Sequence, residues 1–143
     1  MQALQFSLKP NQIEILWNSQ QFILPQGLDA IQQQSLVQGI WSELAIEKMI
    51  YLIEELLESE PQLRHIQGRA VTSDPMMKLL NQLFFKTSNL IDRIQLEHAF
   101  NDFIEHIGYY SRQVAEDQQQ VFVYFVTIRE MMHHLNIQEI LIK

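Results

Sequence analysis

Two groups of histidine and carboxylate side chains have spacings that can hold a divalent metal. His98, Asp102 and His106 recur at every fourth position, so one face of a helix would carry all three. Glu130 and His133 form a Glu-x-x-His pair, the spacing that di-iron helical bundles use on each of two helices. Imidazole and carboxylate ligands suit zinc and iron. These residues define the alternative functional prediction, a metal-dependent or small-ligand-binding helical-bundle enzyme.

The orientation of the same residues favours a solvent-exposed face. Glu130 and His133 point away from the apolar arc of their helix, and His98 and Asp102 lie on the polar side of theirs. Bringing these groups together in a core would bury charge at high cost unless a metal offset it. The Glu-x-x-His pair also occurs only once. Our main expectation is therefore no metal, no cofactor and no catalytic residue.

A row of glutamates lies along the helix expected over residues 35–58. Its members fall within a narrow wedge beside a wide apolar sector, and they are Glu43, Glu47, Glu54 and Glu58. Residues 1–63 hold two basic and eight acidic side chains, a net charge of −6 out of −7 for the whole chain. The row is either a solvated face or a docking surface for a basic protein partner.

The composition argues against several classes of function. Cysteine is absent, which excludes thiol catalysis and disulfides, and no glycine-rich phosphate loop is present. The chain has no basic stripe for nucleic acid or anionic membranes. No apolar run approaches the roughly 20 residues that span a bilayer, and the first residues do not resemble a signal peptide. We therefore expect a cytoplasmic protein.

The first 26 residues alternate as strands do. Leu4, Phe6 and Leu8 recur at every second position, and residues 13–17 and 22–24 are further apolar runs separated by turn signals. We predict an antiparallel β-meander over residues 1–26, with one face packed on the helices after it. Residues 137–143 are expected to form a short strand or tail, and residues 60–73 an irregular connection.

Helical periodicity dominates residues 28–136. Ser73, Asp74 and Pro75 form a helix start, and the apolar stripe after them changes sides, which predicts a break near Ser88. A last helix is expected from about Asp117 to Asn136. Glutamines cluster at residues 32–34 and 118–120, where we expect solvated helix ends.

These elements predict one α+β domain over residues 1–143, mainly α, built as a four-helix bundle with a small antiparallel N-terminal meander. The last helix is apolar almost all round, with Phe122, Val123 and Val126 on its far flanks. That is more apolar surface than one bundle interface hides, and exposed apolar patches mark interfaces. The leading functional prediction is therefore a non-enzymatic interaction or scaffold protein that self-associates as a homodimer through this helix.

Overall fold

The protein is built on one mixed sheet, seen in a computed structural model that describes residues 3–143 apart from the side chain of residue 65. Six strands lie in the order β3-β2-β1-β4-β6-β5. Their bounds are β1 (Leu4–Leu8), β2 (Ile13–Trp17), β3 (Gln20–Leu24), β4 (Gly68–Thr72), β5 (Leu90–Asp92) and β6 (Ile137–Ile142). β4 runs parallel to β1 and β6, whereas the other neighbouring pairs are antiparallel. The sheet is thus parallel at its centre.

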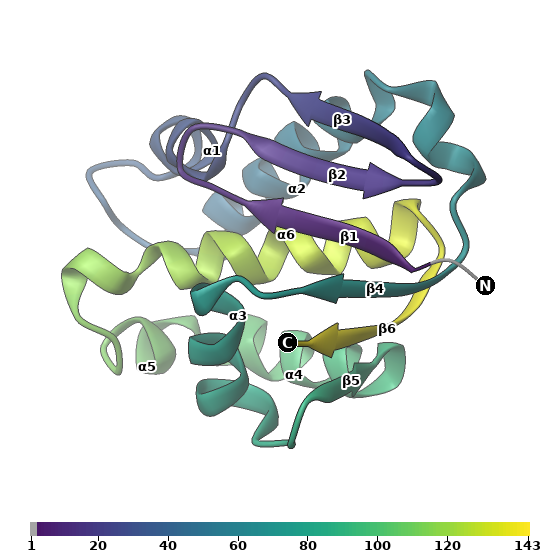
Figure 1. Cartoon of the computed structure of the whole chain (residues 1–143). Helices are drawn as coiled ribbons and strands as arrows, with labels where there is room; N and C mark the ends of the chain where they lie inside the picture. The colour runs from purple at the N-terminus through teal and green to yellow at the C-terminus, as the bar shows by residue number, and fades with distance from the viewer. Residues whose placement is uncertain (1–2) are drawn as a thin grey trace.

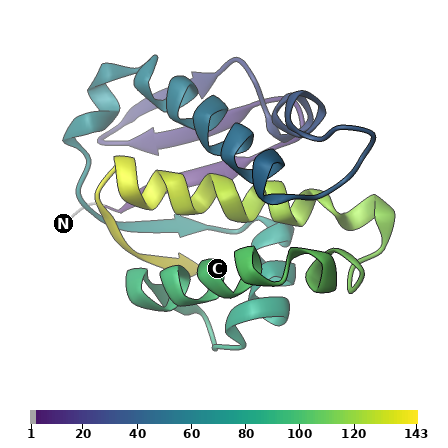
Figure 2. The ribbon, with the colours of Figure 1, turned by 180° about the vertical axis from the view of Figure 1, so that it is seen from behind.

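Helices cover one face of this sheet. They are α1 (Leu28–Ser35), α2 (Glu43–Glu58), α3 (Pro75–Leu80), α4 (Arg93–Glu105), α5 (Ile107–Ser111) and α6 (Gln120–His134), with shorter turns at Pro61–His65, Asn81–Phe85 and Glu116–Gln118. Figures 1 and 2 show the sheet in front and α1, α2, α4 and α6 behind it. Side chains therefore alternate along β1 between buried Leu4, Phe6 and Leu8 and less buried Gln5 and Ser7.

α6 is the central helix of this layer. It contacts α1, α2, α3, α4 and β6, and 11 of its 15 residues are buried. Phe122, Val123 and Val126, on the flanks that we expected a partner to cover, are 0% exposed within this chain. None of the described helices is long and apolar enough to cross a membrane.

The predicted four-helix bundle is wrong. The three N-terminal strands are present, but they form half of a larger α/β sheet that β4 and β6 continue. The error began at β4, which we expected to be an irregular connection. β4 is short and contains Gly68 and Ala70, residue types that are depleted in strands. Without β4, the predicted helices had only one another to pack against.

The helix boundaries show two further differences. The helix expected over residues 35–58 begins only at Glu43, because α1 ends at Ser35 and Ser42 caps α2 by accepting a hydrogen bond from the Ala45 amide at 3.1 Å. The last helix begins at Gln120 rather than Asp117. The expected break near Ser88 is confirmed, because a left-handed residue, Lys86, and then β5 interrupt the chain between α3 and α4.

Asp74, directly after β4, joins three elements. One carboxylate oxygen accepts a hydrogen bond from Ser7 Oγ at 3.0 Å. The other accepts from the Leu8 amide at 3.0 Å and from the Tyr124 hydroxyl at 2.9 Å. Burial and the Asp74 charge raise the pKa of Tyr124 well above its usual range, so its hydroxyl remains a donor. Asp74 therefore holds β1 and α6 to the end of β4 instead of capping α3.

Gly27 lies where α1 meets the turn between β1 and β2. A Cβ atom at this position would be 2.4 Å from the Gln12 nitrogen and 2.5 Å from the Lys9 oxygen. The Leu28 amide also donates to the Lys9 carbonyl at 3.0 Å. A side chain at position 27 would push the turn away from α1.

We predict that Gly27→Ala lowers the free energy of unfolding by about 1–3 kcal/mol, the usual cost of overpacking. Gly108→Ala is the matched control, since the added Cβ would meet only the Arg112 side chain at 3.5 Å. In a helix such as α5, that change should be neutral or stabilising by up to about 1 kcal/mol. Urea unfolding measures both, and an equal loss in the two variants would contradict the tight contact at Gly27.

Asp74→Asn should lower the free energy of unfolding by about 1.5–3 kcal/mol. The NH₂ group of Asn cannot accept a hydrogen bond, so a donor that the carboxylate satisfied would lose its partner. The control is Asp92→Asn at the N-cap of α4, where Asn caps as well as Asp and the cost should stay within about 0.5 kcal/mol. If the two variants unfold at the same urea concentration, Asp74 does not hold β4 in place.

Candidate functional site

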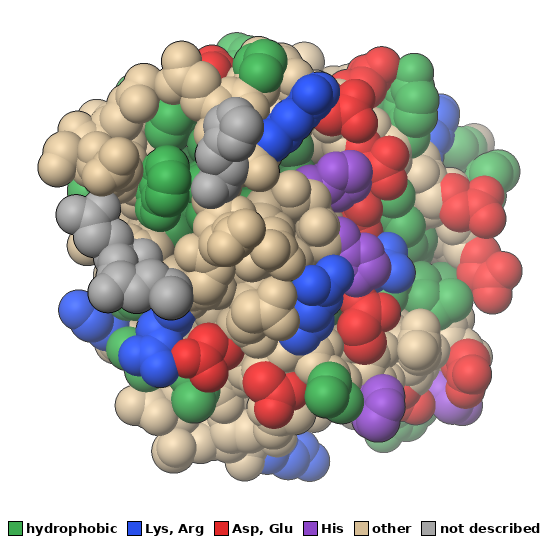
Figure 3. Space-filling model, turned by 90° about the vertical axis from the view of Figure 1, so that its right-hand side faces the viewer, with side chains coloured by type: hydrophobic (Ala, Val, Ile, Leu, Met, Phe, Trp, Pro, Cys, Tyr) green, Lys and Arg blue, Asp and Glu red, His purple; other side chains and the backbone are tan. Residues whose placement is uncertain are grey.

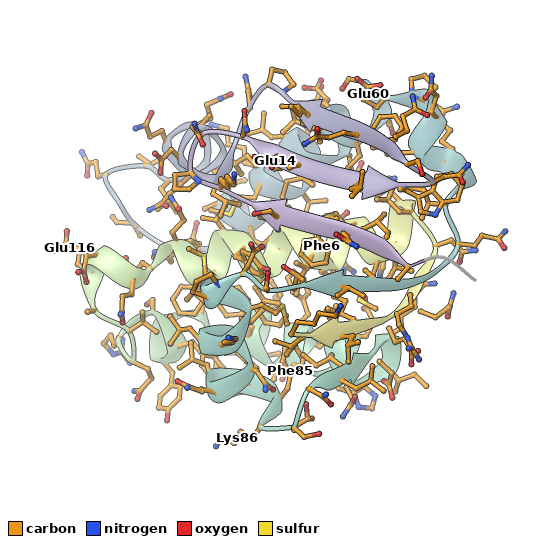
Figure 4. The ribbon with its side chains drawn as sticks, in the orientation of Figure 1. Phe6, Glu14, Glu60, Phe85, Lys86 and Glu116 are labelled. Atoms are coloured by element: carbon orange, nitrogen blue, oxygen red, sulfur yellow. The ribbon has the colours of Figure 1, made fainter. Side chains whose placement is uncertain are left out.

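A cleft opens at the edge of the sheet toward which β1 and β4 point. In α/β sheets, ligands bind beyond the carboxyl ends of the parallel strands. Here a space of about 810 Å³ lies between α1, α3 and the start of α6. Its volume falls within the roughly 300–1,000 Å³ of small-ligand sites. Figure 4 labels Glu116, one of its lining residues, at this end of the molecule.

The cleft combines apolar side chains with carboxylates and amides. Leu36, Met76 and Leu79 supply half-buried apolar surface. The polar side chains that line it come from α1 and from the segment leading into α6, and they are Asp29, Gln32, Gln33, Glu116, Asp117, Gln118 and Gln120. Such a lining suits a ligand with both carbon chain and hydrogen-bonding groups.

Hydrogen bonds fix the two sides of the cleft relative to each other. Gln120 Nε2 donates to Asp29 Oδ1 at 2.6 Å and lies 3.2 Å from Gln32 Oε1. The neighbouring Gln119 accepts a hydrogen bond from Trp41 Nε1 at 3.0 Å. The start of α6 is therefore tied to α1 and to the residue before the cap of α2.

The cleft is acidic. Asp29, Glu116 and Asp117 line it, and none of the three forms an ion pair within residues 3–143. None of the described residues that line it is Lys or Arg. The field inside therefore favours a cation over an anion.

The nearby helix starts offer little to a phosphate group. Phosphates bind at helix N-termini through free backbone N–H groups. In α1, the Leu28 amide donates to Lys9 at 3.0 Å and the Asp29 amide to Pro10 at 2.9 Å. α3 begins with Pro75, which has no N–H. The first two amides of α1 are thus occupied, and the first position of α3 has no amide donor.

The predicted metal ligands on α4 lie on the surface. His98, Asp102 and His106 are exposed, and His106 Nδ1 lies 3.1 Å from Asp102 Oδ1. Asp102 also accepts a hydrogen bond from the Tyr110 hydroxyl. Within the described chain, one group of three or more possible ligand atoms converges, and it contains none of these three residues.

Glu130 and His133 lie instead in a charged cluster near the end of α6. Arg129 donates to Glu130 at 2.7 Å and to Glu97 of α4 at 3.2 Å, and His133 also contacts Glu97. Burial raises the pKa of Glu130. Burial alone would raise the pKa of Glu97 as well, but the hydrogen bonds from His133 and Arg129 outweigh it and lower that pKa. Glu130 is 2% exposed, so the expectation that it is solvated is wrong.

The glutamate row on α2 is not uniform. Glu43, Glu47 and Glu58 are exposed, whereas Glu54 is half-buried and faces His134 at 3.7 Å. The converging group is Glu54, Glu130 and His134, and it shares only Glu130 with the predicted ligand set. A basic protein partner for the row stays a prediction.

The sequence drew attention to several residues of the cleft but did not predict that they line a cleft. The glutamine clusters at residues 32–34 and 118–120 were expected to be solvated ends, yet four of those glutamines line the cleft. The signal for a shared site was the presence of two glutamine clusters, which lie far apart in the sequence. Asp74 was noticed only as a helix cap.

Comparisons with known proteins give a fold. No protein-family model matches the chain, and no curated protein matches it either. Among solved structures, an Aquifex aeolicus PPX-GPPA enzyme matches with a TM-score of 0.78 and 11% identity, over 99% of this chain and 52% of that one. The type II variant of the Aquifex aeolicus Ppx/GppA phosphatase matches with a TM-score of 0.77 and 11% identity, over 99% of this chain and 52% of that one. A third Aquifex aeolicus structure of that family matches with a TM-score of 0.70 and 10% identity, over 99% of this chain and 51% of that one.

These matches and the burial of α6 correct the functional prediction. The chain spans about half the length of the structures that it matches, and at this identity the likeness establishes the fold alone. The predicted non-enzymatic scaffold is wrong, because its proposed interface on α6 is internal and its fold is one that solved enzymes have. The helical-bundle enzyme is wrong in its architecture for the same reason. The chain has a Ppx/GppA-like α/β fold.

Proposed function

We propose that this protein is an α/β ligand-binding domain whose cleft between α1, α3 and α6 takes an organic cation such as a polyamine. The observation that carries the proposal is the acidic lining, in which Asp29, Glu116 and Asp117 have no described cationic partner. Hydrogen bonds between an ammonium group and a carboxylate are roughly twice as strong as neutral ones. A protonated amine is therefore the group that this lining accommodates best.

The rest of the lining matches the rest of such a ligand. The methylene groups of a polyamine can pack on Leu36, Met76 and Leu79, which supply the apolar surface. Further amines can donate to the side-chain oxygens of Gln32 and Gln118, which lie on opposite sides of the cleft. The charged, polar and apolar parts of such a ligand therefore each have matching side chains in the lining.

The ligand proposed here differs from what the matched structures suggest. Two of those proteins are described as an enzyme and a phosphatase. A fold does not carry its activity with it. Because Lys and Arg are missing from the described lining and the first two α1 amides are occupied, we do not propose a phosphate ester as the ligand.

Location and assembly are also proposals. We propose a cytoplasmic location, supported by the lack of cysteine, since nothing in the chain then requires an oxidising compartment. The homodimer stays a prediction, and the face of α6 that motivated it cannot form the contact because that face is buried.

We predict that the double variant Asp29→Asn with Asp117→Asn binds spermidine at least tenfold more weakly than the wild type, a loss of about 1.4 kcal/mol or more. The physical reason is the loss of two carboxylates from the cleft. Isothermal titration calorimetry at low salt measures the affinity, because screening would otherwise hide the difference.

The matched control is Glu58→Gln with Asp92→Asn, which changes the net charge equally at exposed positions outside the cleft. This control should bind spermidine within about twofold of the wild type, since remote exposed charges are largely screened. Equal weakening of the two double variants, or tighter binding of orthophosphate than of spermidine, would contradict the proposal.

A further inference from the structure

Three side chains converge near the C-terminal end of α6, away from the cleft. Glu130 and His134 are four residues apart on α6, so they lie on the same face of the helix. Glu54 approaches them from α2. His134 Nε2 lies 3.7 Å from Glu54 Oε1 and 3.8 Å from Glu130 Oε1, and all three ligand atoms are within 4.8 Å of one another.

Glu130 presents one carboxylate oxygen to this space. Its side chain is 3% exposed, and its Oε2 is held by Arg129 at 2.7 Å. Its Oε1 forms no hydrogen bond within residues 3–143 and faces His134. Taking a carboxylate out of water is costly unless its charge is compensated. A cation in this space would lower that cost.

The distances suit a small transition-metal ion. Zinc binds His nitrogen and carboxylate oxygen at about 2.0–2.2 Å in a tetrahedron, which places ligand atoms roughly 3.3–3.6 Å apart. The two measured separations from His134, 3.7 and 3.8 Å, exceed this by a few tenths of an ångström. Small side-chain rotations of Glu54 and His134, both partly exposed, can close that difference.

The charge around the site also suits a dication. Glu54, Glu97 and Glu130 carry three negative charges against the single positive charge of Arg129. Carboxylates therefore outnumber guanidinium groups in this cluster. Glu97 contacts both Arg129 and His133, so these basic groups are engaged beside the site and leave Glu130 Oε1 free. Arg129 in turn orients the Glu130 carboxylate, as the groups that hold metal ligands in place do in other proteins.

We propose that Glu54, Glu130 and His134 form a binding site for a zinc-class divalent metal, with a fourth coordination position open to solvent. A cavity of about 340 Å³ adjoins His134 and is lined also by Glu58, Arg64 and His133. Figure 3 shows this end of the molecule, where histidine, acidic and basic side chains gather. Three protein ligands with one open position is the arrangement of catalytic zinc sites. The site lies at the other end of α6 from the cleft, so it is independent of the proposed function.

The experiment is a calorimetric titration of chelator-treated full-length protein with Zn²⁺. The wild type should bind one equivalent, and His134→Ala and Glu54→Gln should each weaken binding at least tenfold. His98→Ala is the matched control, because this histidine of α4 is exposed and is not one of the converging residues. This control should stay within threefold of the wild type.

A second measurement keeps the result independent of folding. Circular dichroism should show that His134→Ala and Glu54→Gln fold, since both side chains are partly exposed. Zinc should raise the melting temperature of the wild type and of His98→Ala but not of the two ligand variants. The proposal is overturned if the wild type takes up no zinc at pH 7.5. It is equally overturned if His98→Ala weakens binding as much as His134→Ala.

Discussion

The fold depends on the parallel pairing of β4 with β1 on one side and β6 on the other. Leu4 pairs with Ala70 of β4, and Ala70 pairs with Ile140 of β6. If β4 were removed, the N-terminal meander and the β5–β6 pair would be separate three- and two-stranded pieces, which are marginal by themselves. Asp74 secures this arrangement at the end of β4 by accepting hydrogen bonds from β1 and α6.

The position of α6 depends on that continuous sheet. α6 can be apolar on almost every side because the sheet covers one side while α1, α2, α3 and α4 cover the others. Its polar groups are therefore concentrated at its two ends. Gln120 reaches the cleft at its first turn, and Glu130 and His134 lie in its last turns. At 1.5 Å per residue, the 15 residues of α6 separate these ends by about 22 Å, so two sites can act independently.

Local sequence patterns predicted the local structure well. Alternation at Leu4, Phe6 and Leu8 indicated β1, and the shift of the apolar stripe indicated the break between α3 and α4. β4 could not be recognised in this way. Its five residues include Gly68 and Ala70, and its stability as a strand comes from partners about 66 and 70 residues away. The error in fold class was therefore an error about non-local pairing.

The candidate sites show the same contrast between local sequence patterns and non-local contacts. The glutamine clusters were visible in the sequence, but Gln32 and Gln120 are 88 residues apart and only the fold brings them within 3.2 Å. The Glu-x-x-His spacing drew attention to His133, whereas the structure pairs Glu130 with His134, four residues away, and adds Glu54 from another helix. The residue types indicated which chemistry was possible, and the fold determined which of these residues lie close together.

The central claim about this protein is that its cleft binds an organic cation and not a phosphate group. Its most direct test is an ¹⁵N NMR titration of the full chain, in parallel, with spermidine and with orthophosphate. We expect spermidine to shift the side-chain amide signals of Gln32, Gln118 and Gln120, which line the cleft, and orthophosphate to leave them unchanged. Saturable shifts of these signals by orthophosphate, or spermidine shifts confined to the exposed glutamates of α2, would contradict the claim.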